Sequence, residues 1–188
     1  MNRRGSRRFV MATAAVGWLI LPLVSTSTGS TADSEPEIPA LAEVLAADFA
    51  VVTLEGETVA LSTLVEPGHP LVVELWATWC APCRKTIPHL DELEQRHGDE
   101  IGILGLTVED PDEDREAVRK FIAEEGVGYD VAFAPDELFR FMNDRPDIAV
   151  LKLFVFDADG LLVRYIPRYS PLTPRKLRSA VLETLPAE

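Results

Sequence analysis

The sequence has only two cysteines and three histidines among its 188 residues. Cys80 and Cys83 are three positions apart, so a bond between them closes a loop too small to restrain the unfolded chain, and a purely structural disulfide is a poor explanation. A structural zinc ion needs about four ligands, and no further cysteine exists to supply them. We expect surface or helix-end positions for the scattered histidines, His69, His89 and His97. The sequence therefore predicts no metal site and no cofactor.

Basic residues are also scarce, with 18 lysines and arginines against 31 aspartates and glutamates, a net charge of −13 at pH 7. Four arginines lie within residues 3–8, ahead of the first acidic residue, Asp33. The chain beyond residue 32 thus has 14 basic residues and a net charge of −17. This excess excludes nucleic acid as the partner, suits solubility and favours basic clients.

The longest uncharged apolar run, Phe9 to Val24, is short for a membrane span and carries Pro22 near its end. Arginines precede it and the small residues 30–32 follow it, which predicts a signal peptide over residues 1–32 and an exported protein of the periplasm or cell envelope. Residues 6–11 also resemble a twin-arginine signal. An uncleaved membrane anchor over residues 9–24 is the alternative.

Residues 33–47 are polar and contain prolines, and we predict a flexible linker there, followed by one domain over residues 48–188. Its first strands, Phe49 to Leu54 and Thr58 to Leu61, form a hairpin around Gly56. Leu71 to Trp76 is almost continuously apolar, as expected for a central strand covered on both faces.

The remaining pattern alternates helices and strands. A helix is expected from Cys80 to Arg96, then a strand from Ile101 to Val108 and a helix that starts at Asp110 and ends at Gly126. The acidic run Glu109 to Glu116 is interpreted as the solvated start of that helix. Further expected elements are a strand over 131–134, a helix over 136–143, a hairpin of 150–156 and 161–166, and a helix from 173. This order predicts an α/β domain with a central mixed β-sheet flanked by helices.

The chemistry-bearing segment is Trp76 to Cys83, which directly follows the central strand. A thiol at a helix start has its thiolate stabilised by the helix dipole and by free backbone N–H groups. The spacing therefore predicts a redox-active disulfide in which Cys80 attacks and Cys83 resolves.

From about residue 48 to residue 185 the chain resembles thioredoxin-fold proteins, and among them the exported TlpA/ResA-like thiol-disulfide oxidoreductases that include cytochrome c maturation reductases. The resemblance is carried by the Gly56 hairpin, the sequence Trp79-Cys80-Ala81-Pro82-Cys83, Pro88, and Phe154 to Gly160. It implies a thioredoxin-like fold with an N-terminal β-hairpin extension, exported protein disulfides such as those of apocytochrome c as clients, and a membrane thiol-electron donor. We also expect a monomer.

Glu74 shares a strand face with Val72 and Trp76, where a carboxylate is costly unless it is used or paired. The resemblance aligns Glu74 with a buried acid that relays the proton of the resolving thiol, a catalytic role that needs a raised pKa. The alternative is a glutamate that reaches the sheet edge or pairs with a basic side chain.

The resemblance also implies substrate-binding positions: Trp79 at an apolar rim, Pro82 in the turn, and Val150 and Leu151 in the loop that faces the cysteines. Leu151 stands where the family has a cis-proline. A cis bond before leucine costs about 3 kcal/mol, so we expect a trans bond at Val150–Leu151 and treat Pro146 as an ordinary loop proline. Thr86 replaces a glutamate that many of these reductases carry.

Three alternatives remain open. A thiol peroxidase of the redoxin type is one, although those enzymes place threonine three residues before the reactive cysteine, where this chain has Ala77 and Thr78 comes one position late. A metallochaperone or maturation partner that holds copper(I) on Cys80 and Cys83 is another, since the missing cis-proline leaves metal binding open. The third is a non-catalytic adaptor.

Overall fold

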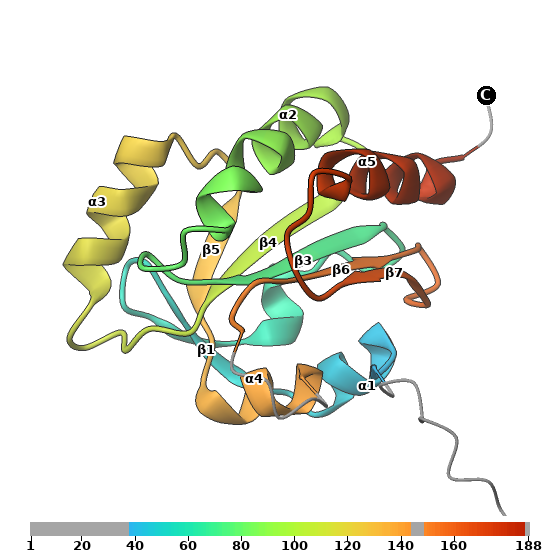
Figure 1. Cartoon of the computed structure of the whole chain (residues 1–188). Coiled ribbons are helices and arrows are strands. Elements are labelled where there is room, and N and C mark those ends of the chain that lie inside the picture. The colour runs from blue at the N-terminus through green and yellow to red at the C-terminus, as the bar shows by residue number, and fades with distance from the viewer. Residues whose placement is uncertain (1–37, 144–148, 187–188) are drawn as a thin grey trace, which may run out of the picture. The chain divides into compact units, whose positions relative to one another are not determined.

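The computed structural model describes residues 38–143 and 149–186, all within the unit that runs from Glu35 to Glu188. Seven strands form one mixed sheet in the order β2-β1-β5-β4-β3-β6-β7 (Figure 1). They are β1 Ala50–Thr53, β2 Thr58–Ala60, β3 Leu71–Trp76, β4 Gly102–Thr107, β5 Asp130–Phe133, β6 Lys152–Phe156 and β7 Leu162–Ile166. The predicted signal peptide, the first part of the predicted linker and Pro146 lie outside the described residues. No helix in the described ranges is long and apolar enough to cross a membrane.

Strand β3 lies in the interior of the sheet, as its apolar sequence predicts. It pairs in parallel with β4 and antiparallel with β6, and all six of its residues are buried. Within this pairing Glu74 lies opposite Gly105 on one side and Leu153 on the other. The position of Glu74 in the middle of the sheet excludes the alternative in which its carboxylate reaches the sheet edge.

Helices cover both faces of the sheet (Figure 1). The α-helices are α1 Leu41–Ala46, α2 Ile87–His97, α3 Arg115–Glu125, α4 Asp136–Met142 and α5 Thr173–Thr184, and the 3-10 helices are η1 Leu61–Leu64 and η2 Cys83–Lys85. The apolar side chains of α2, α3 and α5 form one core with the cysteine pair. Those of α1 and α4 form a second core on the opposite face.

Two predicted helix starts are corrected. The helix expected from Cys80 begins with the 3-10 turn η2, and its regular part starts only at Ile87. The helix expected from Asp110 starts at Arg115, because residues 111–113 form a turn that is closed by a bond from the Asp114 N–H to the Asp110 carbonyl (2.8 Å). The proline and the clustered acids ahead of the helix therefore mark a turn rather than its first residues.

The prediction of a flexible linker over residues 33–47 is also wrong in its second part, because Leu41–Ala46 forms the helix α1. Leu41 and Val44 are buried in the core shared with α4. The prolines before it suggested a linker, whereas the informative signal was the spacing of these two apolar residues on one helical face. The ordered chain therefore begins before the predicted domain boundary at residue 48.

We predict that Val44→Ala lowers the free energy of unfolding by about 2 kcal/mol, because the change removes two buried methyl groups and leaves a cavity. Val44 is only 1% exposed. Chemical denaturation measures the effect, and Ala42→Ser on the exposed side of α1 is the matched control, with a change within about 0.5 kcal/mol. Equal stabilities of the two variants would show that α1 contributes nothing to the core.

Candidate active site

The two cysteines lie at the carboxyl end of β3 and are joined by a disulfide, with their Cα atoms 5.3 Å apart. Cys80 is 6% exposed and Cys83 is completely buried, so Cys80 is the sulfur nearer to solvent. The backbone N–H of Cys83 donates a hydrogen bond to Cys80 Sγ (3.3 Å). The same N–H group can stabilise a thiolate on Cys80 after reduction, which fits the predicted roles of attacking and resolving sulfur.

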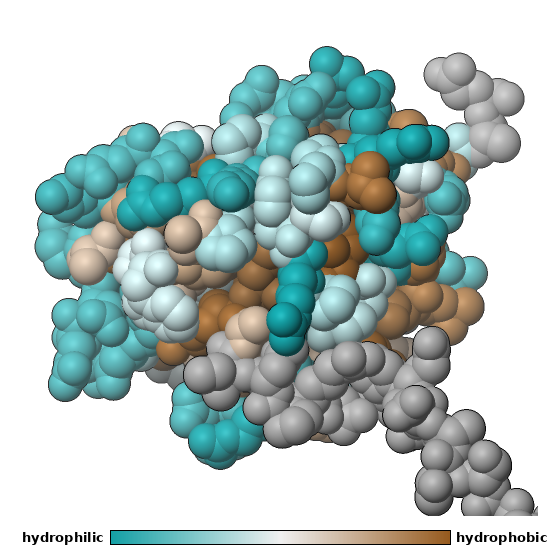
Figure 2. Space-filling model, in the orientation of Figure 1, coloured by the Kyte–Doolittle hydropathy of each residue, from teal (hydrophilic) through white to brown (hydrophobic). Residues whose placement is uncertain are grey.

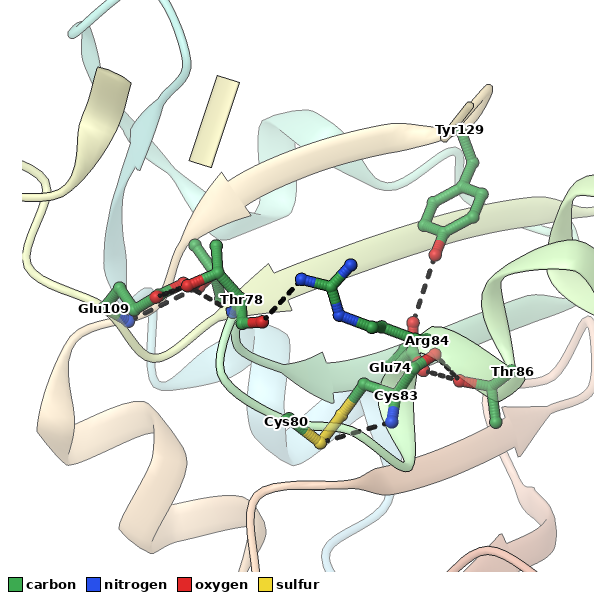
Figure 3. The surroundings of a disulfide bond; sticks show 9 residues. Glu74, Thr78, Cys80, Cys83, Arg84, Thr86, Glu109 and Tyr129 are labelled. Carbon is green, nitrogen blue, oxygen red and sulfur yellow. Dashed lines mark hydrogen bonds between the residues drawn. A yellow bond between two sulfur atoms is a disulfide. The ribbon is translucent and has the colours of Figure 1, made fainter. Parts of the chain in front are cut away.

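Glu74 lies on the same face of the sheet as the cysteines and is fully buried (Figure 3). The Tyr129 hydroxyl donates to Glu74 Oε2 (3.1 Å), and the Thr86 hydroxyl donates to Glu74 Oε1. Gly105 leaves the space for this arrangement, since a Cβ atom there would come 3.0 Å from the Tyr129 ring. The carboxyl group thus has two neutral hydroxyl partners, which removes the other alternative, a pair with lysine or arginine.

Thr86 connects Glu74 to the backbone of the cysteine turn. Its hydroxyl also donates to the Cys83 carbonyl (2.7 Å). Because a hydroxyl has only one proton, it donates fully to one of these two oxygens. A protonated Glu74 resolves the competition: the carboxyl proton bonds to Thr86, and the Thr86 proton bonds to the Cys83 carbonyl.

Burial also favours the protonated form of Glu74. Removal from water raises the pKa of Glu74 from about 4.5 to about 7, and the hydrogen bonds from Thr86 and Tyr129 oppose the shift only in part. Burial and the neighbouring Glu74 carboxylate also raise the pKa of Tyr129 well above its usual value, so that hydroxyl stays protonated and acts as a donor. Glu74 therefore exchanges a proton near neutral pH, as its predicted role requires.

The turn before Cys80 is fixed by two side chains from other elements (Figure 3). Glu109, which follows β4, accepts hydrogen bonds from the backbone N–H of Thr78 (3.0 Å) and from the Thr78 hydroxyl. Arg84 donates to the Thr78 carbonyl (3.4 Å), pairs with Glu125 and lies over the Phe121 ring, 4.5 Å from its centroid. These contacts hold the segment that carries Trp79 and Cys80.

A groove of about 930 Å³ opens beside Cys80. All four predicted substrate-binding residues, Trp79, Pro82, Val150 and Leu151, line it. Trp79 is 67% exposed, whereas Val150 and Leu151 are buried. The described residues contain no cis peptide bond, so the expected trans bond at Val150–Leu151 is confirmed.

Several residues of the site were missed from the sequence. Thr86 was noted only as a departure from a family pattern, and Tyr129 is 55 positions from Glu74 with no local signal of the contact. Glu109 was assigned to a solvated helix start, but it is half-buried against Thr78. In the part of the chain that the structure describes, no cluster of three or more histidine, cysteine or acidic side chains is arranged to hold a metal ion.

Fold and site together define a thioredoxin-like protein with one cysteine pair at the end of the central strand. The sequence matches the model of the AhpC/TSA family over residues 42–165, more than half of the chain. The chain therefore belongs to the AhpC/TSA family, and the predicted resemblance is confirmed.

Several similar proteins are named as thiol-disulfide oxidoreductases or as thioredoxin-like proteins. The thiol-disulfide oxidoreductase ResA of Bacillus thuringiensis (strain Al Hakam) is 30% identical over 122 residues, which span 64% of this chain and 66% of ResA. The thioredoxin-like protein YneN of Bacillus subtilis is 30% identical over 40% of this chain and 44% of its own length. The sporulation thiol-disulfide oxidoreductase A of B. subtilis is 21% identical over 90% of this chain and 92% of its length. The chain thus spans less than two thirds of ResA and YneN.

Solved structures confirm the predicted fold. A thiol:disulfide interchange protein of the thioredoxin family from Chlorobium tepidum TLS is 27% identical, with a TM-score of 0.61 over 82% of this chain and 100% of its own. A secreted disulfide oxidoreductase of Mycobacterium tuberculosis has the same TM-score at 19% identity, and covers 75% of this chain and 98% of its own.

We predict that the pKa of Glu74 makes stability depend on pH. Because the folded state binds the proton more tightly than the unfolded state, the stabilisation is complete below about pH 4.5 and is lost as pH rises to about 7. The rise of the Glu74 pKa from 4.5 to about 7 corresponds to a loss of about 3 kcal/mol. Urea denaturation of the oxidised protein at pH 4, 5.5 and 8 measures this loss, and Glu74→Gln should remove it.

The exposed residue Glu137 on α4 provides the matched control. Glu137→Gln should leave the difference between pH 4 and pH 8 as it is in the wild type. Parallel pH curves for the wild type and Glu74→Gln would contradict the raised pKa.

Proposed function

We propose that the protein is a thiol-disulfide oxidoreductase that exchanges disulfides of exported proteins through Cys80 and Cys83. The observation that carries the proposal is the cysteine pair itself: it forms a disulfide at the edge of an open groove, above a buried carboxyl group with a pKa of about 7. The names of the relatives ResA and sporulation thiol-disulfide oxidoreductase A support the same class of enzyme.

In the first step the Cys80 thiolate of the reduced protein attacks one sulfur of a client disulfide. The client S–S bond breaks, a mixed disulfide forms, and the second client sulfur leaves as a thiolate. The Cys83 N–H, 3.3 Å from Cys80 Sγ, stabilises the attacking thiolate. Trp79, Val150 and Leu151 provide the apolar groove in which the client segment lies.

In the second step Cys83 gives its proton to the Glu74 carboxylate, and its thiolate attacks Cys80 Sγ. The bond between Cys80 and the client breaks, the client leaves as a thiolate that takes up a proton, and the Cys80–Cys83 disulfide forms. Two electrons have then moved from the protein to the client. A dithiol donor must return them, and we assign this role to a membrane thiol-electron donor.

The position of Thr78 makes the peroxidase alternative weaker. A threonine assists a peroxidatic cysteine only if its hydroxyl faces that sulfur, and the Thr78 hydroxyl donates instead to Glu109. The buried second cysteine and the acid on its side of the sheet both fit dithiol exchange.

For the place of action we propose the periplasm or cell envelope, with residues 1–32 as a signal peptide or residues 9–24 as an anchor. Apocytochromes c are the proposed clients. Expression of Cys83→Ser in the native envelope should trap clients as mixed disulfides on Cys80. Recovery of apocytochromes supports the maturation role, and a wide range of other clients replaces it with general disulfide handling.

We predict that Cys80→Ser abolishes reduction of insulin disulfides, since it removes the attacking sulfur. Cys83→Ser should still form the mixed disulfide but not release it, so one client accumulates per protein chain on a non-reducing gel. The matched control is the double variant, which should trap nothing. Insulin reduction by Cys80→Ser at the wild-type rate would disprove the proposed chemistry.

We predict that Glu74→Gln slows release of the mixed disulfide by about 100-fold at pH 6, because the proton acceptor for Cys83 is lost. Tyr129→Phe keeps the ring but removes a hydrogen bond that stabilises the carboxylate, so the pKa of Glu74 and the pH midpoint of release should both rise. Stopped-flow single turnovers resolve attack from release, and the attack step is the internal control. An unchanged pH profile of release in both variants would leave Glu74 without a role in proton transfer.

A further inference from the structure

The groove beside Cys80 is lined by apolar side chains and by positively charged ones. Eleven described residues line it; only two of them, Lys85 and Arg168, are charged, and both are cations. The other lining residues are apolar or aromatic, apart from Cys80 itself. In Figure 2, apolar residues are visible in the middle of the face shown, between hydrophilic residues of the helices.

Lys85 is held in a defined position. Its Nζ lies 5.2 Å from the centroid of the Tyr169 ring, within the range of a cation–π contact. Within the described ranges no ion pair joins Lys85 to a carboxylate, whereas its neighbour Arg84 is paired with Glu125. The charge of Lys85 is thus available to a molecule in the groove.

Helix α5, which follows the groove residue Tyr169 in the sequence, also carries cations, although none of them lines the groove. Helix α5 begins four residues after Tyr169 and has three exposed cations in its first half, Arg175, Lys176 and Arg178. The whole chain has a net charge of −13. At physiological ionic strength charges are screened beyond about 8 Å, so a bound segment responds mainly to the charged side chains that line the groove rather than to the net charge of the chain.

We propose that the groove selects client segments that carry an acidic side chain close to the reactive cysteine, together with an apolar side chain. The apolar side chain packs on Trp79, Val150 and Leu151, and the carboxylate lies beside Lys85. This inference rests on the proposed function and adds a class of substrate to it. It differs from the expectation of basic clients drawn from net charge, because both charged side chains among the described lining residues of the groove are cations.

The test uses the reduced full chain and three peptides of the same length. Each has one cysteine in a mixed disulfide with 2-mercaptoethanol and one neighbouring leucine, and the remaining flanking positions are glutamate, glutamine or lysine. We expect the glutamate peptide to react about fourfold faster than the lysine peptide at physiological salt, the size of one exposed ion pair. Higher salt should reduce this ratio.

Variants at Lys85 test whether this side chain causes the preference for the glutamate peptide. Lys85→Gln should bring the ratio close to one, and Lys85→Glu should invert it. Each rate is divided by the rate with uncharged hydroxyethyl disulfide, which corrects for any change in Cys80 reactivity. Lys120→Glu, at a side chain 74% exposed on α3 and outside the groove, is the matched charge reversal and should keep the wild-type ratio.

The outcomes separate the two proposals. A wild-type ratio near one, or the same preference in wild type and Lys85→Glu, overturns acidic selection while exchange with hydroxyethyl disulfide continues. Absence of exchange with every disulfide, the small neutral one included, overturns the proposed function and this inference with it.

Discussion

The burial of the Glu74 carboxyl group in the middle of β3 is the constraint on which the site depends. An isolated carboxylate at such a position is strongly destabilised, so the acid either takes up a proton or needs donors. Both conditions are present, since its pKa is raised to about 7 and two hydroxyl groups contact it. Gly105 on β4 is part of the same arrangement, because its missing side chain leaves the space for the Tyr129 ring. Residues from β4, from the junction of η2 and α2 and from the segment before β5 thus surround the carboxyl group that β3 carries.

Thr86 stands three residues after the second cysteine, at the position where the family resemblance implied a glutamate. The structure gives Thr86 a related task, since it connects the Cys83 carbonyl to the carboxyl group on β3. The acid therefore comes from β3, and Thr86, which lies between η2 and α2, contributes a hydroxyl group that contacts it. Leu151 stands where the family resemblance implied a cis-proline. It lines the groove beside Cys80, and its peptide bond is trans.

Local patterns in the sequence were sufficient for the central strand, both hairpins and the cysteine pair, because each is encoded by neighbouring residues. The apolar run of Leu71–Trp76 predicted a strand buried on both faces, and the alternation along it placed Glu74 on the face of Val72 and Trp76. The expectation that Glu74 lies beneath the cysteines came from the family resemblance. Contacts made by residues distant in sequence could not be predicted: Tyr129 reaches Glu74 only because β4 and β5 align. Helix α1 is a different kind of failure, since its signal was local but prolines nearby favoured a linker.

The contact between Thr78 and Glu109 has a consequence for how the protein matures. The two residues are 31 positions apart, and the hydrogen bonds between them form only after β3 and β4 have paired in parallel. Parallel pairing is a slow, non-local event in folding. A chain still in an unfolded form already has both sulfurs close together, but it lacks the fixed turn that presents Cys80. The contact therefore makes the reactive geometry a late product of folding.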